Sequence, residues 1–128
     1  IALPTEKMQP NRDFSGQRFC FHQAAETNWS AQRDIGFERR DFGFVEATRN
    51  IVSAGVIRGF TGSTLPTKSH QNELLFSFVL QGSMALECEG GRVLQLAAGD
   101  AFTIPAGMDY SLSDCSKDLE FLEIVAPG

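Results

Sequence analysis

The sequence predicts one all-β domain, built as a sandwich or a barrel. Its 128 residues suffice for a single hydrophobic core and are too few for a separate cofactor-binding domain. From residue 37 onward, short apolar segments alternate with turn sequences rich in Gly, Pro, Asp and Ser, and no long helical period appears. The content of 42% hydrophobic and 21% charged residues is typical of a globular protein, so a disordered or fibrous chain is excluded.

Residues 1–36 are predicted to form an N-terminal arm and covering segment. Residues 1–17 contain prolines and mixed charges without an apolar period, which predicts an arm that lies over the barrel or is poorly ordered. Phenylalanines alternate along 18–22, which is typical of a short strand. Residues 23–36 are polar and predict a helical turn that Trp29 anchors onto the rest of the domain.

Residues 37–128 are predicted to form the β-barrel domain. Residues 61–66 combine Gly, Ser, Thr and Pro and are interpreted as a turn. The apolar segments between the turns are predicted as strands over residues 42–46, 50–60, 74–80, 83–88, 92–96, 101–104, 110–113 and 119–125.

The pattern inside two strands indicates how they are buried. Met84, Leu86 and Cys88 alternate with polar residues, so they share the face that meets the core. Residues 74–80 are apolar on both faces, which is typical of a strand covered on both sides. The second cover is either the N-terminal segment or a partner subunit, and a homodimer is predicted.

Charge and cysteine content exclude several classes of protein. Sixteen Asp and Glu against eleven Lys and Arg give a net charge of −5, which argues against a nucleic-acid partner. No apolar run approaches the ~20 residues that cross a bilayer, and the opening residues show no secretory signal. Cys20, Cys88 and Cys115 are odd in number and widely spaced, which predicts neither a disulfide framework nor a thiolate zinc site. A cytoplasmic protein is expected.

Two motifs resemble those of the cupin family. In the stretch from Gly99, a proline follows six residues later at Pro105 and Gly107 comes two residues after it, as in the second conserved cupin motif. Upstream, His70 and the strand that ends in Val-Leu-Gln-Gly at Gly82 resemble the first motif. The resemblance implies a double-stranded β-helix, or jelly-roll barrel, and the strand over 119–125 fits the same pattern.

The resemblance also implies where metal ligands would lie. Cupin metalloproteins use an H-x-H pair, a Glu and a further His, and these places fall on Lys68, His70, Leu75 and Tyr110. A register that starts at His70 places Glu73 too early for the acidic position. An ammonium group repels a cation and Leu75 offers no donor, so no cofactor is expected and a divalent transition metal is disfavoured.

The residue types at these places favour an organic ligand that is either anionic or hydrogen-bonding. Lys68 and His70 suit a carboxylate or phosphate, and the Tyr110 hydroxyl suits a ligand oxygen. Arg58 would strengthen an anion site if it turned inward, and would be an interface or ion-pair residue if it turned outward. Structural interpretations also exist: His70 as a histidine at the rim, Tyr110 as a core aromatic residue and Lys68 as a solvated lysine.

Three functions follow from these residues. The first is a protein that binds or senses a small molecule inside the barrel. The second is an enzyme, either a metal-free isomerase or epimerase in which His70 and Tyr110 act as base and acid, or a metal-dependent, dioxygenase-like protein. The third is a scaffold for dimerisation.

Cys20 and His22 lie two residues apart, as two ligands of a zinc site could. The simpler interpretation of this pair is a packed thiol beside a surface imidazole.

Overall fold

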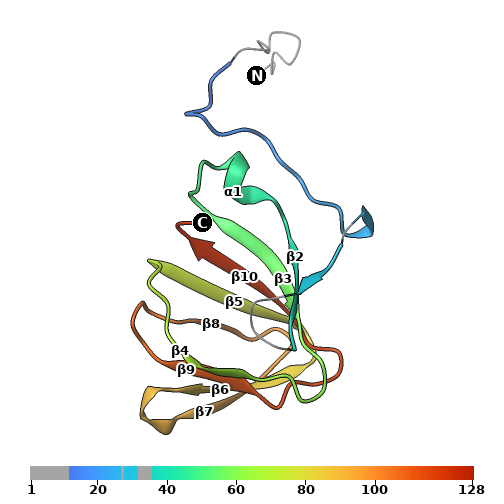
Figure 1. The fold of residues 1–128 in the computed structure, drawn as a ribbon, viewed down its shortest axis with the longest axis vertical. Coiled ribbons are helices and arrows are strands. Elements are labelled where there is room, and N and C mark those ends of the chain that lie inside the picture. Colours follow the sequence, from blue (N-terminus) through green and yellow to red (C-terminus); the bar gives the residue numbers. More distant parts are fainter. Residues whose placement is uncertain (1–11, 27, 32–35) are drawn as a thin grey trace.

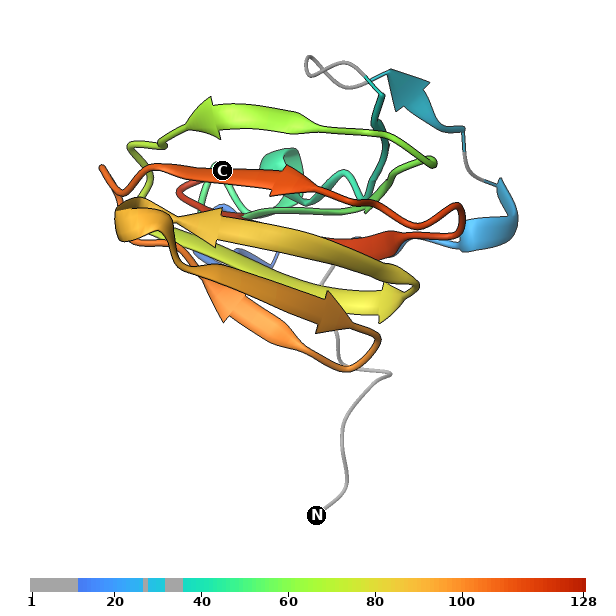
Figure 2. The same cartoon turned by 90° about the horizontal axis from the view of Figure 1, so that it is seen from below.

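Two antiparallel β-sheets pack face to face in this protein (Figures 1 and 2). The computed structural model describes residues 12–26, 28–31 and 36–128. Within these residues, no helix has the length and the apolar composition that crossing a membrane requires. The elements are η2 (Ala24–Glu26), β1 (Ser30–Ala31), β2 (Glu38–Asp41), α1 (Phe44–Ala47), β3 (Ser53–Arg58), β4 (Leu65–Lys68), β5 (Leu74–Gln81), β6 (Ser83–Cys88), η3 (Glu89–Gly91), β7 (Val93–Ala97), β8 (Ala101–Thr103), β9 (Tyr110–Ser113) and β10 (Glu120–Ala126).

The strand order is that of a jelly-roll barrel, which confirms the predicted fold class. One sheet has the order β1-β2-β3-β10-β5-β8 and the other the order β4-β9-β6-β7. Chain-distant strands therefore lie side by side, since β10 sits between β3 and β5 and β9 sits between β4 and β6. These crossovers bring residues from distant parts of the chain around one interior.

The core fills the space between the two sheets. Along β5, Leu75, Ser77 and Val79 are buried while the residues between them keep solvent access, as the two-residue period of a strand requires. Met84 and Leu86 of β6 are fully buried on the facing sheet, which confirms the predicted inner face of that strand. Cys88 is partly buried and packs against the same core.

The predicted strand over 42–46 is wrong. The strand lies earlier, at β2, and Phe44–Ala47 form the short helix α1. Gly43 has a φ of 78°, a left-handed conformation that ends the strand, and its N–H donates a hydrogen bond of 2.8 Å to the Asp41 carboxylate. The charged sequence of β2 hides its strand character from an apolar pattern.

The predicted turn over 61–66 is partly wrong, because β4 begins at Leu65. This strand lies at the edge of its sheet, where Pro66 removes no ladder hydrogen bond that a neighbour needs. The later strands over 74–80, 83–88 and 110–113 are confirmed.

The covering segment is joined to the barrel. β1 pairs with β2. The Arg58 guanidinium carbon lies 4.2 Å from the centre of the Trp29 ring, so Trp29 anchors this segment as predicted. The helical turn is present as η2, whereas residues 18–22 form no strand in the described part of the chain. Part of the predicted arm, residues 1–11, lies outside the described residues.

Candidate ligand site inside the barrel

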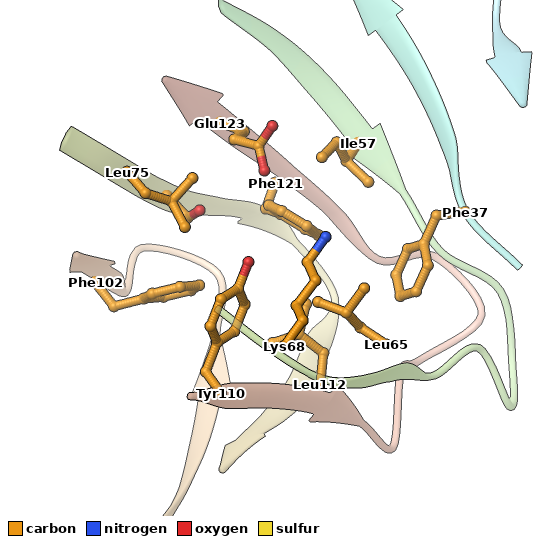
Figure 3. A pocket seen from close by; sticks show the side chains of 11 residues that line it. Phe37, Ile57, Leu65, Lys68, Leu75, Phe102, Tyr110, Leu112, Phe121 and Glu123 are labelled. Carbon is orange, nitrogen blue, oxygen red and sulfur yellow. The ribbon is translucent and has the colours of Figure 1, made fainter. Parts of the chain in front are cut away.

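A cavity of about 40 Å³ lies between the two sheets (Figure 3). Most of its wall is apolar and comes from Phe37, Ile57, Leu65, Leu75, Phe102, Leu112 and Phe121. Four polar side chains interrupt this wall, namely Lys68, Ser77, Tyr110 and Glu123. A small number of polar groups in an apolar cavity is the usual composition of a small-molecule site.

Lys68 and Tyr110 line the cavity from two paired strands. Leu65 pairs with Leu112, and three residues later Lys68 pairs with Tyr110, which is only two residues from Leu112. The extra residue is a β-bulge, which shifts the alternation of β4 by one position. Lys68 therefore faces the same interior as Leu65, although an unbroken strand would turn it outward.

The two side chains differ in solvent access. Tyr110 is buried, with 6% of its surface exposed, and packs within the core cluster. Lys68 is exposed overall, and its chain reaches inward beside Leu65 and Leu112 (Figure 3). Lys68 thus extends into the cavity from a solvent-exposed position on β4, whereas Tyr110 is buried in the core.

Glu123 brings a carboxylate to the opposite wall of the cavity. It lies beside Ser77 in the register of β10 and β5, and the Ser77 side chain is buried. The Arg39 guanidinium donates a hydrogen bond of 2.7 Å to the Glu123 carboxylate in a partly buried ion pair. The Tyr110 hydroxyl and the Glu123 carboxylate both point into the cavity (Figure 3).

Sequence reasoning missed Glu123, although a signal for it was present. Phe121 and Glu123 are two residues apart on one strand, so they share a face. Once Phe121 is assigned to the core, Glu123 must face the same interior.

His70 is not among the side chains that line the cavity. Its Nε2 lies 2.5 Å from the carbonyl oxygen of Ile104, and its Nδ1 accepts a hydrogen bond of 3.1 Å from the backbone N–H of Asn72. Because both ring nitrogens bond to backbone, the ring joins two loops at the end of the barrel. The structure therefore brings Lys68 and Tyr110 together without His70.

Arg58 turns away from the cavity as well. Its guanidinium forms an ion pair with Glu38 and lies over the Trp29 ring. Of the two orientations left open by the sequence, the structure shows the outward one.

The polar residues of the cavity do not match the donor set of a divalent metal. In the described ranges, no three His, Cys, Asp or Glu side chains gather as a metal site. The carboxylate that is present, on Glu123, is already bound by Arg39. Outside the cavity, the Cys20 thiol lies 3.9 Å from the Gly43 carbonyl oxygen and the His22 ring stacks on Phe42.

Comparisons with known proteins give the fold family. The sequence profile described as "Cupin domain" matches residues 61–125, just over half of the chain. Among solved structures, KdgF from a Halomonas species has a TM-score of 0.73 at 20% identity, with 84% of this chain and 94% of that chain covered. A search of curated proteins returned no significant match.

Two further solved structures share the fold. The polyketide cyclase RemF from Streptomyces resistomycificus has a TM-score of 0.75 at 16% identity, covering 87% of this chain and 81% of its own. A predicted oxalate decarboxylase from Thermotoga maritima has a TM-score of 0.72 at 21% identity, covering 81% of this chain and 96% of its own. At these identities the similarity shows a common architecture.

Proposed function

Since this chain belongs to the cupin domain family, we propose that its barrel binds a small organic carboxylate in the cavity between the sheets. The observation that carries the proposal is the bulge in β4, which turns Lys68 inward beside Tyr110. The Lys68 ammonium attracts the carboxylate, and the Tyr110 phenol donates a hydrogen bond to one of its oxygens. The apolar wall then packs against the short hydrocarbon part of the ligand.

The charge of the site favours a single negative charge on the ligand. Of the two charged side chains that line the cavity, Glu123 is held in an ion pair by Arg39, whose guanidinium also contacts Asp41 outside the cavity. The positive charge that faces the ligand is therefore that of Lys68, and one carboxylate would neutralise it. Apolar walls strengthen this attraction because they lower the local dielectric constant.

The volume of the cavity limits the ligand's size. A cavity needs about 10–15 Å³ to hold one water molecule. The 40 Å³ present here accommodates a few non-hydrogen atoms without movement of the walls. Acetate and propionate are therefore suitable probes.

A second candidate is acid–base catalysis on the bound carboxylate. The Tyr110 hydroxyl and the Glu123 carboxylate both point into the cavity from opposite sheets, so a donor and an acceptor of protons face the same space (Figure 3). Arg39 binds Oε1 of Glu123, so in this proposal the other carboxylate oxygen takes the role that the sequence suggested for His70, both of whose ring nitrogens are bonded to backbone.

Titration calorimetry with matched ligands tests the binding proposal. Acetate and propionate should bind, while acetamide and propionamide, which have the same shape and no charge, should bind at least ~10-fold more weakly. Lys68→Met should weaken propionate binding by at least ~10-fold, because a charge-assisted hydrogen bond contributes about 1.5–3 kcal/mol. Tyr110→Phe should weaken it by about 3–10-fold.

The matched control is Lys117→Met, which removes the same charge from an exposed loop residue outside the cavity. It should leave propionate affinity unchanged, and so should prior dialysis of the wild type against a chelator. Equal affinity for amides and carboxylates, or full affinity in Lys68→Met, would contradict the proposal. Loss of binding after dialysis would show that a metal holds the ligand.

A further inference from the structure

Arg39 reaches the cavity wall from two strands away. It lies on β2, whereas its partner Glu123 lies on β10, with β3 between them. The guanidinium also donates to Ser53 Oγ at 3.1 Å and, through Nε, to an Asp41 carboxylate oxygen at 3.2 Å. Five N–H groups in a planar fork allow one arginine to hold several acceptors in fixed directions.

Gly55 is the residue that leaves room for this crossing. It lies opposite Asp41 on one side of β3 and opposite Glu123 on the other. A Cβ at this position would lie 3.0 Å from both Cζ and Nε of Arg39 and 2.9 Å from the Arg40 carbonyl oxygen. A side chain on Gly55 would therefore collide with the guanidinium where it passes over β3.

We infer that Arg39 determines the anion preference of the cavity by binding and neutralising Glu123. This inference rests on the proposed function. A carboxylate in the wall repels an incoming carboxylate, and the repulsion is strong across an apolar cavity. The Arg39–Glu123 ion pair cancels that repulsion, so that the positive charge of Lys68 governs the ligand. Arg39 is a positioning residue, since it lies behind Glu123.

A charge-rescue experiment distinguishes this role from a merely structural one. Arg39→Met should weaken propionate binding by about 10-fold, because Glu123 then faces the ligand without its counter-ion. Arg39→Met combined with Glu123→Gln removes both charges and should restore affinity to within about 3-fold of the wild type. A structural defect at Arg39 would persist in the double variant.

Arg40→Met is the matched control. Arg40 is the neighbouring residue of the same strand, and its guanidinium lies over the Trp29 and Phe42 rings instead of reaching Glu123. This variant loses the same charge and should bind propionate like the wild type. Circular dichroism melting curves should show that each variant is folded at the titration temperature.

The outcomes separate this inference from the proposed function. If the wild type binds propionate and Arg39→Met binds it equally well, the inference is overturned and the carboxylate site stands. If the double variant stays as weak as Arg39→Met, Arg39 acts through structure alone and the inference is also overturned. If the wild type binds no carboxylate, the proposed function fails and the inference fails with it.

Discussion

At the scale of single residues, Cys115 shows how burial changes chemistry. The side chain belongs to the core cluster with 4% of its surface exposed. Burial and, to a smaller extent, the neighbouring Asp114 carboxylate together raise the pKa of its thiol from 9.0 to about 11. Cys115 is therefore a protonated, apolar core residue at neutral pH rather than a reactive thiol.

This pKa predicts a loss of stability in base. Below pH 9 the thiol is protonated in both the folded and the unfolded states, so it adds no pH dependence. Between pH 9 and 11 the unfolded state releases the proton first, so the free energy of unfolding falls as pH rises. Urea unfolding of the wild type and Cys115→Ala at pH 8 to 10.5 should show a steeper fall for the wild type; equal slopes would contradict the assignment.

The site residues differ in how far sequence could predict them. Motif spacing predicts that Lys68 and Tyr110 lie near each other, and both side chains line the cavity. His70 was placed by the same spacing, but spacing says nothing about the Ile104 carbonyl that binds its ring. The sequence does not predict that Arg39 contacts Glu123. This contact requires that residue 55, on the strand between them, has no side chain.

At the scale of elements, Gly82 makes the turn between β5 and β6 possible. Its φ is +79°, which disfavours any residue with a Cβ. A Cβ there would also lie 2.7 Å from Leu119 Cα and 2.8 Å from Leu119 N. The turn thus packs directly on the backbone that leads into β10, and a side chain would push the two apart.

Gly62 provides a matched comparison for Gly82. Its φ is +83°, nearly the same, but a Cβ there would meet no atom within 4 Å. Gly62→Ala should cost only the conformational penalty of about 1–2 kcal/mol. Gly82→Ala should cost that amount and at least ~1 kcal/mol more, as is usual for forcing atoms into a packed site. Equal losses in urea unfolding would show that the close approach to Leu119 is unimportant.

The elements that sequence predicted best are those with an apolar alternation and a turn at each end. β5, β6 and β9 meet both conditions and were placed within a residue. β2 and β4 lack an apolar pattern, since one is charged and the other contains Pro66, so their strand structure depends on neighbours elsewhere in the chain. No sequence pattern near β4 predicts its bulge either, although the bulge turns Lys68 toward the cavity.

At the scale of the whole molecule, the outer face of the larger sheet predicts association. The side chains of β5 that alternate with its buried residues are all apolar, and Leu74 and Leu80 at its two ends are exposed. Phe76 and Phe78 lie beside Ile124 and Leu122 of β10 in the strand register, which continues the apolar surface across two strands. Contiguous apolar surface of this kind marks an interaction site.

The N-terminal arm carries a second apolar surface. Phe19 and Phe21 are 86% and 65% exposed, with ring centroids 5.8 Å apart. Their neighbours Arg18 and Cys20 contact the rest of their own chain. The Arg18 N–H donates to the Ala47 carbonyl, and the Cys20 thiol lies against the Gly43 carbonyl. One chain therefore presents an apolar sheet face and an apolar arm, and a two-fold pair of chains would cover both.

We propose that the protein forms a homodimer in which each arm packs on the β5–β10 face of its partner. Light scattering after gel filtration should give twice the chain mass. Phe19→Ser with Phe21→Ser should give a monomer, because two large apolar rings are lost from each arm. Val93→Ser, at an exposed valine of the other sheet, should stay dimeric. A monomeric wild type, or a dimeric double variant, would refute this arrangement.

The cavity claim is tested most directly by a propionate titration followed with ¹⁵N and ¹³C NMR of the labelled chain. If propionate binds in the cavity, saturable shift changes should be largest at its polar wall residues, Lys68, Tyr110, Ser77 and Glu123. Shifts confined to exposed loops, or a spectrum unchanged at high propionate concentration, would contradict it.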